Sequence, residues 1–304
     1  MAQQKLKWVF LFTLALLWGS SFILIKKGLI GVSPLELGAL RTLFAGVFLV
    51  IIGFRSLSKV KGKIWYWLIL SGFLGTFFPS ILFSYAETEI DSAIASILNS
   101  TVPLQALVVG IIFFKGQFFL KQFTGVLIGL LGSFLLIWIG ASVKSDQNYW
   151  FALLPIIAST MYAINANIIK FKLKELSALS ITAASFLLLI PSSLGVLIAT
   201  DFFATENLQQ SSTQTALWYI LALALLGTTF AKIIFNRLVK LSNPVFSTSV
   251  TYLIPVVALF WGILDGEQFQ WSQLFAGAII LLGVYLSGRK KKAKTQKNSA
   301  KQRS

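Results

Sequence analysis

Several uncharged polar side chains fall near the middle of long apolar stretches of this chain. A polar group surrounded by hydrocarbon is costly, so a side chain retained there is by default a candidate for binding a solute. Amides, hydroxyls and aromatic faces suit an uncharged or zwitterionic polar molecule. The candidates of this kind are Trp18, Ser21, Asn99, Tyr162, Asn165 and Tyr252. The alternative is that such groups only join helices to one another, at about 0.6 kcal/mol per hydrogen bond.

Two basic residues also fall within apolar stretches. Lys232 shares a helical face with Thr229 and Asn236, and an ammonium group there would hold the carboxylate of a solute. Its long apolar stem would equally allow the charged end to reach the membrane interface. Arg41 is expected to brace the helices, against Glu36 or against the carboxyl end of a helix. Lys232 therefore joins the candidate binding residues, and Arg41 does not.

Two prolines interrupt apolar stretches at corresponding places. A proline inside a helix removes an amide donor and frees a carbonyl group, so the helix kinks or breaks there. Pro103 and Pro255 are therefore candidate hinges. The alternative is a static kink that neighbouring helices absorb.

The chain lacks the side chains on which most enzyme and metal sites depend. It has no Cys and no His, which excludes thiol nucleophiles, imidazole bases and the common transition-metal ligands. No Asp or Glu lies deep within an apolar stretch, although proton-coupled pumps usually carry one there. We therefore expect no catalytic residue, no metal site and no cofactor, and a solute gradient as the driving force.

Positioning the candidate residues requires helices that cross a bilayer. The mean hydropathy is +0.80, 56% of the residues are hydrophobic and 12% are charged, so a soluble fold could not cover its surface. The apolar runs are of the roughly 20 residues that a helix needs to cross about 30 Å of hydrocarbon. The predicted fold class is an all-α integral membrane protein with ten transmembrane helices, at residues 8–27, 34–54, 65–85, 92–114, 120–139, 149–169, 178–199, 216–238, 244–264 and 271–287.

The basic residues predict the orientation of these helices. Of the 26 Lys and Arg residues, Arg41 and Lys232 lie within spans, and the opposite side of the membrane receives only Lys26, Lys27 and Lys144. The rest collect on the side of both termini, which the positive-inside rule assigns to the cytoplasm. This pattern explains the net charge of +16 better than nucleic-acid binding does. The expected location is the bacterial inner membrane, with the lipid bilayer as a partner and no nucleic acid.

The two halves of the chain resemble each other. Leu74-Gly75-Thr76-Phe77-Phe78 recurs 152 positions later as Leu226-Gly227-Thr228-Thr229-Phe230, and the same offset relates Pro103 to Pro255. Nearer the amino end the offset is about 144, which pairs Trp18 with Tyr162. Five spans per half is an odd number, so the second half enters the membrane in the opposite sense. We predict two inverted five-helix repeats, at residues 1–140 and 148–288, followed by a basic, disordered cytoplasmic tail at 289–304.

The sequence resembles the EamA-type transporters of the drug/metabolite transporter superfamily. The resemblance rests on residues 17–22 (Leu-Trp-Gly-Ser-Ser-Phe), on Arg41, on Pro103 and Pro255, and on the glycine-rich segments at 125–132 and 277–283. It covers nearly the whole chain except the tail. It implies export or exchange of amino acids or related metabolites through a central cavity between two helix bundles. That family carries chemically varied solutes, so the resemblance does not name one.

These observations favour a secondary transporter over other membrane proteins. Inverted repeats are typical of carriers that bind a solute near the midplane and expose it alternately to each side. We expect a small polar metabolite such as an amino acid, and export or exchange. An intramembrane enzyme would need a nucleophile–base pair or a carboxylate dyad that is absent here. The alternative function is a non-transporting membrane scaffold or assembly factor, and the oligomeric state stays open.

Overall fold

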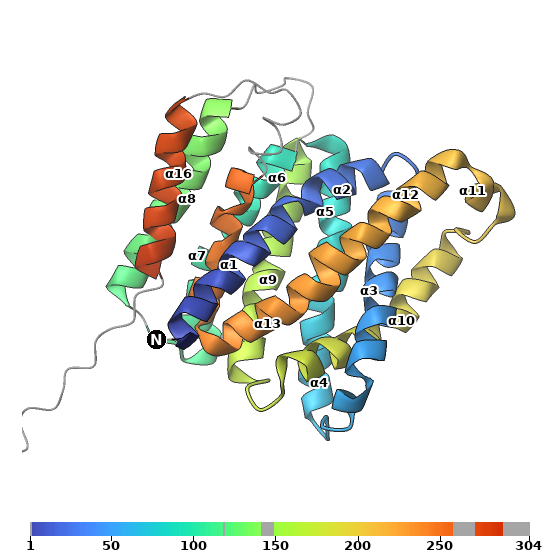
Figure 1. Cartoon of the computed structure of the whole chain (residues 1–304), viewed down its shortest axis with the longest axis horizontal. Coiled ribbons are helices and arrows are strands. Elements are labelled where there is room, and N and C mark those ends of the chain that lie inside the picture. The colour runs from blue at the N-terminus through green and yellow to red at the C-terminus, as the bar shows by residue number, and fades with distance from the viewer. Residues whose placement is uncertain (1, 91, 118, 141–148, 258–270, 288–304) are drawn as a thin grey trace, which may run out of the picture.

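A computed structural model describes the chain except for residues 1, 91, 118, 141–148, 258–270 and 288–304 (Figure 1). The described residues form helices joined by short turns, with no strand among them. Six helical runs are long and apolar enough to cross a membrane, and four further apolar segments are 10–17 residues long. The chain is therefore an all-helical protein with several apolar spans, as predicted. The predicted tail at 289–304 lies outside the described residues.

The first half contains five of the predicted spans. Their helices are α1 (Ala2–Gly19), α2 (Ser21–Gly28), α3 (Pro34–Leu57), α4 (Ile64–Gly72), the π-helix η1 (Phe73–Phe77), α5 (Phe78–Glu89), α6 (Ser92–Asn99), α7 (Val102–Phe114) and α8 (Leu120–Gly140). Helix α3 begins at a capping box, in which the Ser33 side chain and the Glu36 side chain each bond the other residue's backbone. Pro34 follows at a position where a helix tolerates proline because its missing N–H has no partner there.

The second half repeats this order. Its helices are η2 (Tyr149–Ala152), α9 (Leu153–Phe171), α10 (Ala178–Ala199), α11 (Thr205–Gln209), α12 (Ser211–Ala222), the π-helix η3 (Leu223–Phe230), α13 (Ala231–Leu241), α14 (Pro244–Thr248), the 3₁₀ turn η4 (Ser249–Tyr252) and α16 (Trp271–Ser287). Both π-helices contain a copy of the repeated Leu-Gly-Thr motif. A π-helix widens one turn of a helix and is frequent at functional sites.

Two predicted spans break where the sequence places a candidate hinge. Helix α6 ends at Asn99 and α7 begins at Val102, and Pro103 is the second residue of the new helix. In the second half η4 ends at Tyr252 and the helix resumes at Ile254, so Pro255 is again the second residue. The Ser100 hydroxyl joins the two breaks, because it donates a 3.1 Å hydrogen bond to the carbonyl of Thr251.

Helices at equivalent places of the two halves pack against each other. Helix α3 lies along α10, and α8 lies along α16 at one edge of the molecule (Figure 1). Glycines allow the second contact: a side chain on Gly125 or Gly283 would collide with the backbone of the facing helix. Small residues let membrane helices approach closely. The Gly125-x-x-x-Gly129 spacing is thus used within the chain.

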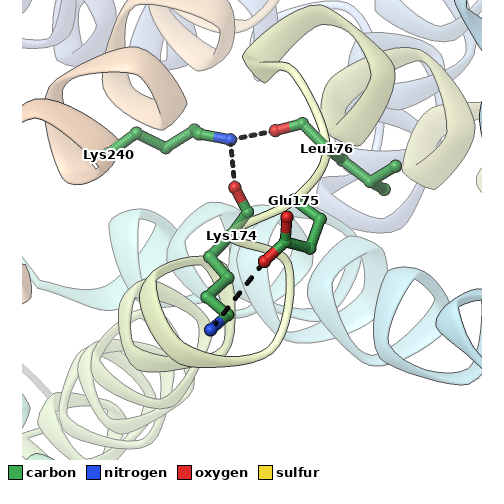
Figure 2. A network of polar contacts seen from close by, with 4 residues as sticks. All are labelled: Lys174, Glu175, Leu176 and Lys240. Carbon is green, nitrogen blue, oxygen red and sulfur yellow. Dashed lines mark hydrogen bonds and ion pairs between the residues drawn. The ribbon is translucent and has the colours of Figure 1, made fainter.

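Lysine side chains bond backbone carbonyls at the end of the molecule where α9 and α13 terminate. The ammonium group of Lys240, on α13, donates to the carbonyl of Lys174 at 2.7 Å and to that of Leu176 in the turn after α9 (Figure 2). In the opposite direction, Lys170 on α9 donates to three carbonyls at the end of α13, including that of Ser242 at 2.5 Å. These groups satisfy helix-end carbonyls that would otherwise lack donors.

Candidate solute-binding cavity

A cavity of about 80 Å³ lies inside the molecule and is lined by residues from both halves of the chain. Helices α1, α2 and α3, the η1–α5 run and the α6–α7 break contribute from the first half. Helices α9 and α13 and the α14–η4 segment contribute from the second. The lining residues are Trp18, Ser21, Phe22, Ile25, Arg41, Thr76, Ser80, Phe83, Asn99, Val102, Tyr162, Asn165, Lys232, Phe235, Thr248, Val250, Thr251 and Ile254.

Most of the predicted binding residues meet in this cavity although they are far apart in the sequence. Those among its lining are Trp18, Ser21, Asn99, Tyr162, Asn165 and Lys232. Lys232 is 8% exposed and contacts the interior, so its ammonium group does not reach the membrane interface. Lys232 therefore lines the cavity, and its binding of a solute carboxylate stays a prediction.

Tyr252 lies elsewhere. Its side chain is completely buried, and its hydroxyl donates a 3.0 Å hydrogen bond to the carbonyl of Val126 on α8. The ring packs on Gly129, where an added side chain would collide with it. The helical spacing placed Tyr252 on the face of Thr248, but the 3₁₀ turn η4 rotates the residues that follow it. Tyr252 therefore joins η4 to α8 and is not part of the cavity lining.

A backbone carbonyl in the π-helix of the first half accepts a side chain from the other half of the chain. In an α-helix the carbonyl of Gly75 would accept the N–H of residue 79, but that residue is Pro79 and has no N–H. The ammonium group of Lys232, from the second half, donates to this carbonyl. The same ammonium lies 5.2 Å from the ring centroid of Tyr162, within cation–π range.

The π-helix of the second half does the same with the carbonyl of Gly227. The N–H of Ala231, which an α-helix would direct to Gly227, is donated to Thr228. The Gly227 carbonyl instead accepts the indole N–H of Trp18 at 3.0 Å and one nitrogen of Arg41 at 3.4 Å. Both Trp18 and Arg41 belong to the first half, so each π-helix is contacted by side chains from the other half of the chain.

Arg41 lines the cavity as well as bracing it. Its Nε donates to the Thr228 hydroxyl at 2.7 Å. Glu36, the partner considered from the sequence, bonds the Ser33 backbone in the capping box instead. Arg41 therefore braces the helices by bonding a π-helix of the other half. Its guanidinium also adds a second positive charge to the lining.

The contacts around the two motif glycines are repeat-related. A side chain at Gly75 would collide with the amide of Asn165, and one at Gly227 would collide with the Ser21 hydroxyl. Ser21 and Asn165 are themselves 144 positions apart. Asn165 accepts a 2.7 Å hydrogen bond from Ser71, whereas Ser21 donates to Leu17 at 2.7 Å. The two glycines are therefore needed for close helix approach.

One lining residue keeps an unused hydrogen-bonding atom. Asn99 is 6% exposed, and its Oδ1 is buried without a hydrogen-bond partner among the described residues. It ends α6, directly before the break that precedes Pro103. Buried amide oxygens are almost always paired. Asn99 is thus available to a hydrogen-bond donor that enters the cavity.

The prediction from polarity alone missed much of the lining. The missed residues are Phe22, Ile25, Arg41, Thr76, Ser80, Phe83, Val102, Phe235, Val250, Thr251 and Ile254. The internal repeat could have identified several of them, because many lining residues are related in pairs by the sequence offsets of the repeat. Such pairs are Trp18 with Tyr162, Ser21 with Asn165, Ser80 with Lys232, Phe83 with Phe235, Asn99 with Thr251, and Val102 with Ile254.

The lining is largely apolar, and the charged side chains in it are positive. Among the residues that the structure describes, it contains Arg41 and Lys232 and no acidic side chain. Within the described part of the chain, no three His, Cys, Asp or Glu residues are grouped as metal ligands would be. Aromatic rings and aliphatic side chains make up most of the remaining wall. The cavity therefore suits a small solute that carries an anionic group.

Comparison with known proteins identifies the family. The model of the EamA-like transporter family matches residues 6–138 and again 149–289. The chain is 28% identical over 296 residues to an uncharacterized inner membrane transporter, YedA, of Escherichia coli, covering 91% of this chain and 90% of that protein. It is 23% identical over 280 residues to the uncharacterized transporter YoaV of Bacillus subtilis, covering 90% and 94%.

Other matches agree. The chain is 24% identical over 298 residues to the protein PecM of Dickeya dadantii, covering 95% of this chain and 97% of that one. A solved crystal structure superposes with a TM-score of 0.70 at 17% identity, covering 92% of this chain and 95% of that chain, which shows a shared fold. With two copies of the family model spanning nearly all of its length, the chain is a multi-pass membrane protein that belongs to the EamA-like transporter family.

Proposed function

We propose that this protein is a secondary carrier of small polar metabolites that bear a carboxylate, such as amino acids. The observation that carries the proposal is the cavity in which Arg41 and Lys232 meet, each bonded to a π-helix of the opposite half. A carboxylate between them would be paired with buried cations in surroundings of low dielectric constant. Asn99 would accept a hydrogen bond from the solute's ammonium group.

We further propose that the two halves, residues 1–140 and 148–288, are inverted five-helix repeats that expose the cavity alternately to the two sides. Repeat-related contacts at Gly75 and Gly227 support this, as does the packing of α3 on α10 and of α8 on α16. The breaks before Pro103 and Pro255 would let the ends of those spans move, with the Ser100–Thr251 hydrogen bond between them. Both termini and the tail at 289–304 are assigned to the cytoplasm.

The proposed driving force rests on the same residues. The described lining holds no carboxylate that a proton could titrate during transport, so the proposal is export or exchange down a solute gradient. A membrane enzyme is disfavoured because no nucleophile–base pair lines the cavity. The remaining alternative is a membrane scaffold that transports nothing. In that case, substituting a lining residue would not change solute movement.

Counterflow in proteoliposomes tests the proposal. Vesicles would be loaded in turn with unlabelled leucine, phenylalanine, serine or glutamate, and entry of the labelled amino acids would be followed. Each amino acid would be paired with its amino alcohol, which lacks the carboxylate. We expect counterflow with some of the acids and with none of the alcohols. Absence of counterflow from folded protein across a wide solute panel would favour the scaffold, and strict dependence on an imposed pH gradient would contradict gradient-driven exchange.

A further inference from the structure

The carbonyl of Gly75 is a ready acceptor for a cation. Pro79 has no N–H to donate to it as an α-helix would require, and Gly75 lies in the π-helix η1 directly before Thr76, which lines the cavity. In carriers with interrupted helices, freed backbone carbonyls at this depth coordinate a transported Na⁺ or H⁺. Here the position is occupied by the ammonium group of Lys232, which reaches it from the opposite half.

The surroundings of Lys232 leave it able to bind a second group. An ammonium group has three N–H donors, and the carbonyl of Gly75 takes one of them. The face of the Tyr162 ring lies 5.2 Å away and stabilises the positive charge without using a donor. Since Lys232 also lines the cavity, its remaining donors are available to a carboxylate that enters.

The local charges favour an anion over a further cation. Arg41 and Lys232 both line the cavity and interact electrostatically with each other. Glu87 also interacts with Arg41 but lies outside the lining. These three residues sum to one positive charge, which a single carboxylate neutralises. An inorganic cation entering the same space would be repelled by two positive charges.

We propose that Lys232 is the resident counter-ion of the carried solute. Its ammonium group fills, from within the chain, the carbonyl site that an inorganic cation fills in cation-coupled carriers, and it pairs with the solute's carboxylate. This inference rests on the proposed function. Its consequence is that the protein moves a carboxylate without any co-transported Na⁺ or K⁺, and that the positive charge at Gly75 is indispensable for transport.

Counterflow with and without inorganic cations tests the first consequence. The probe is the labelled amino acid with the highest wild-type counterflow in the panel above. Replacing all Na⁺ and K⁺ by N-methylglucamine on both sides should leave the wild-type rate unchanged. A several-fold drop in that rate, restored by sodium, would overturn the inference while leaving the carrier in place. Absence of wild-type counterflow would instead contradict the proposed function itself.

Chemical rescue tests the second consequence. Lys232→Ala removes the ammonium and leaves space, and Lys232→Met removes it while filling the space. Each should lower counterflow by about ten-fold or more, as expected when a charge-assisted contact of about 1.4 kcal/mol or greater is lost. Ethylammonium should restore several-fold activity to Lys232→Ala and none to Lys232→Met. Lys27→Ala, on an exposed lysine of α2, is the control and should match the wild type.

The folded state of each variant is followed by its melting temperature in detergent. Ethylammonium should raise that of Lys232→Ala and leave that of Lys232→Met unchanged, which shows that the amine occupies the vacated space. A purely structural lysine would leave counterflow intact in a folded Lys232→Met, whereas loss of a counter-ion would not. Wild-type counterflow in both variants would overturn the inference. If Lys232→Ala does not fold, Lys232→Arg is used instead, because it keeps the positive charge and should retain counterflow. The inference would be contradicted if Lys232→Arg folds but is inactive while Lys232→Met is active.

Discussion

The two copies of the Leu-Gly-Thr motif have the same backbone form but are held by different donors. In the first half the carbonyl of Gly75 is freed by Pro79 and accepts the single ammonium of Lys232. In the second half the carbonyl of Gly227 is freed by a shifted N–H at Ala231 and accepts an indole and a guanidinium. Arg41 also bonds the neighbouring Thr228.

We infer from this difference that the two equivalent motifs have different roles. The site at Gly227 is held by rigid planar donors that make several bonds at once, and such donors lose little freedom on binding. The site at Gly75 is held by one group on a flexible four-carbon stem. We therefore interpret the second motif as the braced side of the cavity and the first as the side whose cation is shared with the solute.

The largest expected effect comes from filling the space at the two motif glycines. Gly75→Leu and Gly227→Leu should each destabilise the protein by about 3 kcal/mol, because a side chain there collides with Asn165 or Ser21. Melting followed by tryptophan fluorescence in detergent measures this. The control is Gly195→Leu on α10, where an added Cβ meets nothing within 4 Å. A tolerated Gly227→Leu would break the claim that both motifs are closely packed.

Substituting the two basic residues should distinguish the braced side of the cavity from the side whose cation is shared with the solute. Arg41→Lys loses the planar fork on Gly227 and Thr228 and should cost about 2 kcal/mol of unfolding free energy. Lys232→Met should cost less than about 1 kcal/mol, because replacing a buried charge by an apolar side chain of similar volume is often neutral. Equal melting temperatures for the two variants would contradict the distinction.

A smaller effect is expected at Lys170 and Lys26, two equivalent lysines whose surroundings differ between the halves. Lys170 donates to three carbonyls at the end of α13, whereas Lys26, its counterpart 144 positions earlier, is exposed. Lys170→Met should lower the unfolding free energy by about 1.5 kcal/mol, and Lys26→Met should leave it unchanged. Chemical denaturation of the two purified variants compares them, and an equal response would show that the contact is not stabilising.

The smallest effect is expected at the motif threonines. Thr228→Val removes the hydroxyl that accepts from Arg41 and should cost about 0.6 kcal/mol, the usual size of a hydrogen bond between membrane helices. Thr76→Val, at the equivalent position of the first motif, should leave the melting temperature unchanged. A larger loss from Thr76→Val than from Thr228→Val would reverse the assignment of the braced side.

The irregular turns within the helices show which structural features the sequence could predict and which it could not. The prolines 103 and 255 predicted irregular helices, and the structure has a break directly before each. The π-helices at Phe73–Phe77 and Leu223–Phe230 had no such signal beyond the repeated motif, because one widened turn leaves the hydrophobic pattern almost unchanged. Tyr252 was placed on the wrong helical face because η4 is a tighter 3₁₀ turn, which changes the direction of the side chains along it.

The sequence by itself determined the class of protein, because composition and run length depend on no distant contact. It also revealed the repeat and most of the polar residues that line the cavity, since a buried polar group in an apolar run is costly wherever the run packs. Only the tertiary structure decided that Lys232 reaches Gly75 and that Arg41 reaches Gly227 and Thr228. Each of these contacts joins residues more than a hundred positions apart, and local pattern holds no information about which carbonyl a long side chain will meet.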